Sequence, residues 1–303
     1  MAGDDLIHVP LAPPPGVFGY ATYATLPATD VDLPLIGAAW ATDHCDDPLR
    51  TTLERYIGDG RVGTMVVPRS AGPEPPLEML RAMRLGPEEE RRFHGATHVV
   101  LIRAPFAFRA PPLHVLGPLA VANGIAATFA GVVLDPLVPR LLPVATQSET
   151  LPANGDVTIV KHIVCPMSAE PDGTAWMTTL GMPKFGLPNF EMRYLPPNLS
   201  EVLPIMNAVA YRVLREGLAQ ARRRPGDDAL REVTLPAELR ITHADLVGAF
   251  GKGTDRGGST TVRMSWTGRA RPELEPFVEI GPPRGFDGAH GEWYTAMLRE
   301  FLR

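Results

Sequence analysis

The hydrophobic residues of this chain recur with two different spacings, which predict both helices and strands. A spacing of three to four residues is clearest over 199–224, where it predicts one long amphipathic helix. The same spacing predicts further helices over 48–57, 77–85, 87–93, 113–130, 243–250 and 291–302. Alternating or continuous apolar runs predict strands over 17–26, 33–42, 61–68, 97–103, 132–134, 156–165, 176–181, 190–195, 230–235, 239–242, 260–267 and 277–280.

The order of these elements predicts an α+β fold. Residues 97–103 lack alternation, so we expect a strand that is buried on both faces, followed by a helix and a second strand at 132–134. The remaining strands follow one another with few intervening helices, which is typical of antiparallel pairing. We therefore predict mixed, mostly antiparallel sheets with long helices packed on one face.

A polar stretch over 144–155 is the best candidate for a domain boundary. It divides the chain into an N-terminal α+β half, residues 1–150, which contains the βαβ-like unit, and a C-terminal α+β half, residues 151–303. Both halves combine strands with one dominant helix. A degenerate duplication is left open, because the two halves share no firm residue pattern.

Composition narrows the class of protein. The 303 residues are 45% hydrophobic and 21% charged, which is typical of globular proteins, and the net charge of −5 disfavours nucleic acid as a partner. Glycine and proline interrupt the longest apolar stretch, residues 113–134, so no membrane span is expected. The start of the chain carries acids where a signal peptide has bases, and two cysteines cannot form a disulfide framework. We therefore expect a soluble cytoplasmic protein.

Lysine is rare in this chain. Only Lys161, Lys184 and Lys252 occur among the 29 basic residues, and a lysine amine titrates more readily than an arginine. Lys161, His162 and Cys165 are weak catalytic candidates, because an amine, an imidazole and a thiol lie within five residues. In a strand, His162 and Cys165 would face opposite ways, which disfavours a nucleophilic pair. A strand with a buried small residue at Cys165 explains the segment equally well.

Two loops contain candidate ligand-binding residues. In the first, Trp176 precedes a loop over 181–188 in which Lys184 and Phe185 could form a wall over a pocket and meet an anion, or simply a rigid connector. If the lysines are functional, Lys161 and Lys184 should approach the same cavity.

The second loop, residues 250–261, contains Lys252 and Arg256 among several glycines. Its spacing fits neither a phosphate-binding loop nor a dinucleotide fingerprint. A mobile turn is the simpler interpretation, and a nest of backbone amides that binds an anion is the alternative.

No recognisable motif identifies a reaction. We predict no metal site and no cofactor, since the acids around Cys45 are explained by a helix start and no partner pair has ligand spacing. The leading hypothesis is a binding or interaction protein that recognises a protein or small-molecule partner. The alternative is a cofactor-independent enzyme with a site between strands 156–180 and loop 181–188. An exposed apolar patch would favour the first, and a pocket with a desolvated titratable group would favour the second.

Overall fold

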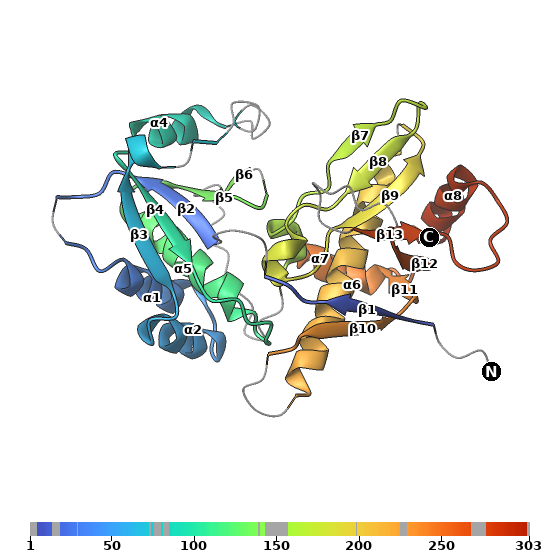
Figure 1. Cartoon of the computed structure of the whole chain (residues 1–303), viewed down its shortest axis with the longest axis horizontal. Helices are drawn as coiled ribbons and strands as arrows, with labels where there is room; N and C mark the ends of the chain where they lie inside the picture. The colour runs from blue at the N-terminus through green and yellow to red at the C-terminus, as the bar shows by residue number, and fades with distance from the viewer. Residues whose placement is uncertain are drawn as a thin grey trace. The chain divides into compact units, whose positions relative to one another are not determined.

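The computed structural model describes residues 5–13, 19–28, 30–72, 74–75, 80, 85–138, 140–142, 157–197, 199–224, 229–267 and 277–301. The chain forms two compact units, one of Pro14–Asp156 and one of Met1–Pro13 with Val157–Arg303 (Figure 1). Among the described strands, every pair is antiparallel except one, and helices and strands follow each other without regular alternation. The predicted α+β fold is confirmed.

The N-terminal unit is built on a five-stranded sheet in the order β3-β4-β2-β5-β6. Its strands are β2 (Gly19–Ala24), β3 (Gly63–Pro68), β4 (His98–Arg103), β5 (Val132–Asp135) and β6 (Arg140–Leu142). Both β4 and β5 pair antiparallel with β2, so they run parallel to each other with β2 between them. The helix α5 (Leu113–Thr128) joins β4 to β5 along the chain and thus completes a split strand–helix–strand unit.

Helices cover both faces of this sheet (Figure 1). On one face, α5 packs with α1 (Leu33–His44) and α2 (Leu49–Gly58) around a core that includes Val100, Ile102 and Val133. On the other face, Phe93 of α4 (Pro87–Gly95) packs against Tyr23 and Val99. The predicted helix over 77–85 falls mainly outside the described residues.

The strand expected over 33–42 is wrong, because this segment forms helix α1. The Asp32 side chain accepts a hydrogen bond from the Leu35 amide at 3.0 Å, and Pro34 lies in the first turn. Both features start helices. The run is apolar on nearly all sides, so its spacing alone could not distinguish a buried helix from a buried strand.

The C-terminal unit contains a six-stranded sheet in the order β11-β12-β13-β9-β8-β7. Its strands are β7 (Met167–Ala169), β8 (Ala175–Thr178), β9 (Phe190–Leu195), β11 (Glu238–Thr242), β12 (Ser259–Trp266) and β13 (Val278–Gly281). A separate two-stranded sheet pairs β1 (Leu6–Pro10) with β10 (Glu232–Pro236). The helices of this unit are α6 (Leu203–Arg222), α7 (His243–Phe250) and α8 (His290–Phe301).

The strand expected over 156–165 is also wrong. The described part of this segment forms a short 3-10 helix, η3 (Ile159–Lys161), and a single bridge between Val164 and Leu180. Ile159, His162 and Ile163 are all buried, and their spacing of three and four residues is that of a turn rather than a strand. The residues 144–155 expected to separate the halves lie outside the described ranges.

Helix α7 begins where its sequence predicts. The Thr242 hydroxyl accepts from the Asp245 amide at 3.3 Å, and the Asp245 carboxylate accepts from the Thr242 amide at 2.8 Å. This reciprocal pair is a capping box. None of the helices in the described part of the chain is both long and apolar enough to cross a membrane.

Candidate functional site

The catalytic candidates Lys161, His162 and Cys165 lie around η3 rather than on a strand. The His162 ring is buried and meets the Phe185 ring edge-on, with centroids 5.6 Å apart. Cys165 donates from Sγ to Oδ1 of Asn207 on α6 at 3.5 Å. These contacts pack the segment against its surroundings.

Burial raises the pKa of the Cys165 thiol to about 12. A thiol nucleophile acts as its thiolate, which needs a nearby positive charge to form at neutral pH. The Cys165 thiol is therefore neutral under ordinary conditions, which argues against a role as a nucleophile.

The structure brings Lys161 close to Lys252 instead of confirming a shared cavity with Lys184. Burial, and then repulsion by the Lys252 ammonium, lower the pKa of Lys161. The loop after α7 reaches η3 because Gly251 has a left-handed backbone, with φ of 65°, and a Cβ there would lie 2.7 Å from Oγ1 of Thr158. Lys184 itself is 8% exposed.

The loop over 181–188 forms part of the core of the unit. Its centre is a short 3-10 helix, η4 (Met182–Phe185), and Gly181 and Gly186 on either side adopt left-handed conformations. All four residues of η4 are buried, including Lys184 and Phe185. The arrangement fits the rigid connector rather than a lid that faces solvent.

Trp176 belongs to a polar cluster on β8 and β9. Its indole Nε1 donates to Oε2 of Glu191 at 2.9 Å, and the Arg193 guanidinium donates to both Glu191 oxygens at 2.9 and 3.1 Å. Arg193 also lies over the Trp176 ring, 5.7 Å from its centroid. Both carboxylate oxygens of the buried Glu191 therefore have partners within the cluster, as a buried carboxylate requires.

Sequence reasoning missed Glu191 and Arg193. The signal was available in the predicted strand over 190–195, where a charged residue stands between Phe190 and Met192. A carboxylate at such a position needs a cationic partner close by.

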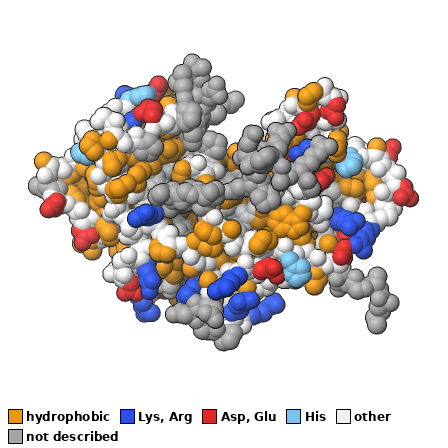
Figure 2. All heavy atoms as spheres, in the orientation of Figure 1, with side chains coloured by type: hydrophobic (Ala, Val, Ile, Leu, Met, Phe, Trp, Pro, Cys, Tyr) orange, Lys and Arg blue, Asp and Glu red, His pale blue; other side chains and the backbone are white. Residues whose placement is uncertain are grey.

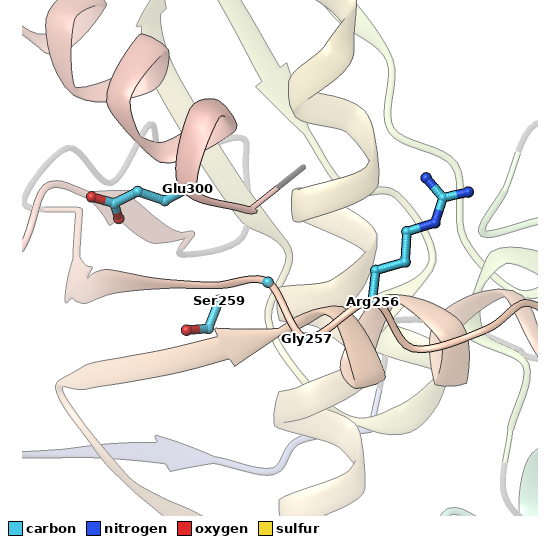
Figure 3. Close-up of a pocket in the computed structure, with 5 residues that line it drawn as sticks. Arg256, Gly257, Ser259 and Glu300 are labelled. Atoms are coloured by element: carbon cyan, nitrogen blue, oxygen red, sulfur yellow. The ribbon is translucent and has the colours of Figure 1, made fainter.

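Arg256 lines a hollow of about 480 Å³ together with Gly257, Gly258, Ser259 and Glu300 (Figure 3). The Arg256 and Glu300 side chains extend away from each other in this view. The amide of Arg256 donates to Nδ1 of His243 at 3.1 Å, and the amide of Gly257 donates to Oδ1 of Asp255 at 2.9 Å. These two amides are thus engaged within the protein, which disfavours the alternative interpretation of this loop as an anion nest.

The exposed edge of the N-terminal sheet has a different character. Met65 and Val66 of β3 are 54% and 46% exposed, and they are the one consecutive pair among the large exposed hydrophobic residues of the described ranges. Figure 2 shows hydrophobic side chains gathered over this part of the N-terminal unit. β3 is an end strand of the sheet, and it pairs with β4 alone.

The pairing register indicates which backbone groups of β3 point outward. The Arg69 amide donates to the Thr97 carbonyl at 2.9 Å, and the register of β3 with β4 places Val67 opposite Val99. Hydrogen-bonded pairs recur at every second residue of an antiparallel ladder, so Met65 and Val67 point their amides and carbonyls toward β4. Thr64, Val66 and Pro68 then point theirs away from the sheet. Pro68 fits this assignment, since proline is tolerated in an edge strand where its missing N–H would face outward.

The end strands of the two larger sheets differ in how they are protected from pairing. β6 and β7 each contain three residues, and β11 carries the exposed charged residues Glu238 and Arg240. Short length and charge both discourage pairing with another strand. β3 has six residues and no charge, and Pro68 stands at its last position. Of the described end strands in these sheets, β3 is the one best suited to accept a further strand.

No protein-family model matches the chain, and neither the curated proteins nor the solved structures include one that is significantly similar to it.

Proposed function

We propose that this protein is a binding protein that recognises an extended segment of a protein partner by adding it as a strand to the outer edge of β3. The observation that carries the proposal is the apolar, uncharged edge of β3, with Met65 and Val66 exposed. In recognition of this kind, main-chain hydrogen bonds supply affinity and the alternating side chains supply specificity.

The two faces of β3 both favour apolar partners. Thr64 and Val66 lie on the face covered by α1 and α5, since they are paired with Ile102 and Val100. Met65 lies on the opposite face, next to Leu101. A bound strand should therefore carry apolar or β-branched residues at consecutive positions. A strand with one face in solvent would instead alternate apolar and polar residues.

The alternative, a cofactor-independent enzyme with a site between strands 156–180 and loop 181–188, has less support. The thiol of Cys165 is neutral, and the loop side chains are packed in the core of the unit. The polar cluster around Glu191 satisfies its own charges.

The proposal is tested by selecting peptides from a random display library on the immobilised protein and measuring their Kd for two variants. Val66→Pro removes the outward amide while leaving the amides that bond β4 in place, so we expect binding to weaken by about tenfold or more. Val66→Thr keeps the amide and the branched side chain, and it should bind nearly as the wild type does. Thermal unfolding checks that both variants fold.

Two results would contradict the proposal. One is a set of selected peptides that bind the wild type and Val66→Pro equally. The other is a library that yields no specific peptide at all.

A further inference from the structure

We infer that the strand added to β3 is the β3 strand of a second copy of this chain, antiparallel and related by a two-fold axis that passes between the two Met65 residues. This inference rests on the proposed function and names the partner for the same edge. Pairing of this kind would join two N-terminal sheets into one continuous sheet across the axis. A two-fold interface needs a surface that is complementary to itself, and β3 has that property in one register.

The register follows from the outward backbone groups. With Met65 opposite Met65 of the second copy, Thr64 stands opposite Val66 and Val66 opposite Thr64. These are the residues whose amides and carbonyls point away from β4, so each pair exchanges both of its hydrogen bonds. Every outward group of Thr64 and Val66 in both copies is then satisfied.

The neighbouring registers form fewer bonds. An axis through Val66 would place Thr64 opposite Pro68, which has no amide hydrogen to donate and whose carbonyl already accepts from the Gly72 amide at 3.1 Å. An axis through Thr64 would place Val66 opposite Val62, which lies outside the strand. The register centred on Met65 is therefore the one that uses the most backbone groups of β3.

The side chains of β3 do not oppose this pairing. Residues 62–68 carry no charge, so the paired segment itself brings no like charges together. Just beyond it, Arg61 stands opposite Arg69 of the second copy, and the Arg69 guanidinium is already paired with the Glu74 carboxylate at 2.6 Å. The Met65 side chains would meet across the axis on one face, and methionine adapts readily to an irregular apolar contact. On the other face, Val66 would pack beside Thr64 of the second copy.

Single cysteine substitutions test the register directly in the full-length protein. In the inferred register Met65 forms a non-hydrogen-bonded pair with its symmetry mate, with Cα atoms about 4.5 Å apart, which a disulfide can span. Met65→Cys should therefore give a covalent dimer under mild oxidation. In a dimer of Thr64→Cys, or in one of Val66→Cys, each new cysteine is offset from the same cysteine of the second copy by two residues. The offset is about 7 Å along the strand, which is too far for a disulfide to bridge. The wild type, whose Cys45 is buried and Cys165 partly buried, is the control for background cross-linking.

Sedimentation velocity over a wide range of concentration supplies the second measurement. The wild type should pass from monomer to dimer as concentration rises, and Val66→Pro should remain monomeric at every concentration. A wild type that stays monomeric, with no covalent dimer of Met65→Cys, would overturn the inference. If display peptides still bind β3 in that case, the proposed function stands and only the identity of the partner is wrong. Preferential cross-linking at Val66→Cys would also overturn the inferred register.

Discussion

Burial controls the chemistry of Cys165 at the scale of the single residue. The thiol has one hydrogen-bond acceptor, Oδ1 of Asn207, and its pKa is raised to about 12 because the charged form would be poorly solvated. The residue type and its neighbours Lys161 and His162 made it a candidate nucleophile in the sequence. Solvation depends on what surrounds the side chain in three dimensions, so this property could not be predicted from the five-residue segment.

The raised pKa predicts a specific alkylation profile. Burial raises the pKa of the Cys165 thiol to about 12, so at pH 9 the thiol of the folded protein is still almost entirely protonated. In the native protein its reaction with iodoacetamide should still be increasing above pH 10, whereas in the urea-unfolded chain it should have levelled off by about that pH, since an ordinary cysteine has a pKa of about 8.5. Mass spectrometry of the Cys165 peptide measures both rates. Equal rates for folded and unfolded protein at pH 9 would show that the thiol is ionised as an ordinary cysteine.

The raised pKa also fixes the sign of the effect on stability. Above the ordinary cysteine pKa, the unfolded chain loses the thiol proton while the folded chain keeps it. Folding is then linked to proton uptake, so the contribution of Cys165 to stability is fully present below that pKa and falls as the pH rises toward 12.

At the scale of the element, the contact between α6 and α7 depends on a close approach at Gly248. A Cβ at this position would lie 2.3 Å from Cε1 of Tyr211. The Arg215 guanidinium lies over the Tyr211 ring, 5.7 Å from the ring centroid. Asp245, also on α7, forms an ion pair with Arg215, in which Oδ1 of Asp245 lies 3.1 Å from Nη1 of Arg215. The two helices are thus held in one relative position by packing and by charge.

We predict that Gly248→Ala lowers the free energy of unfolding by about 1–3 kcal/mol, because the ring must shift to admit a methyl group. The matched control is Gly58→Ala at the end of α2, where a Cβ would meet no atom within 4 Å. That variant should be neutral or more stable by about 0.5–1 kcal/mol, since alanine favours helices over glycine. Urea unfolding compares the two, and a Gly248 variant as stable as the Gly58 variant would show that the helices adjust without cost.

Helices and strands were predicted correctly where the capping residues and the apolar spacing indicated the same element, and wrongly where the spacing stood alone. Helix α7 has both a cap and apolar spacing, and its start was placed correctly. Helix α1 and the segment over 156–165 are apolar without a decisive period, and both were assigned as strands. For such runs the outcome depends on tertiary packing, which propensity does not contain.

At the scale of the whole molecule, the N-terminal strand belongs to the C-terminal unit. β1 pairs with β10 along its length, and Val9 is 1% exposed opposite Val233. Sequence patterns could not reveal this pairing, because the partners are separated by more than two hundred residues. The edge position of β3 could not be predicted for the same reason, since the order of strands in a sheet is not the order along the chain.

This connection predicts where a mutation in the first ten residues acts. Val9→Ala removes buried methyl groups and should lower the free energy of unfolding by about 2 kcal/mol. The loss of hydrogen-exchange protection should appear in residues 229–267, which include β10, and leave the strands of the N-terminal unit unchanged. Replacement of Leu6, which is 50% exposed, by alanine is the control for a change in the same strand. Loss of protection centred on β2 or β4 would contradict the assignment of β1.

The most direct measurement of the central claim is amide hydrogen exchange along β3 at low and high protein concentration. The account predicts that Met65 and Val67 are protected at both concentrations by their bonds to β4, whereas Thr64 and Val66 become protected only at high concentration, when their outward amides bond a second β3 strand. Addition of a β3-dependent peptide should protect the same two amides at low concentration. Rapid exchange of Thr64 and Val66 under all three conditions, with Met65 and Val67 still protected, would show that the edge stays open and would contradict recognition by strand addition.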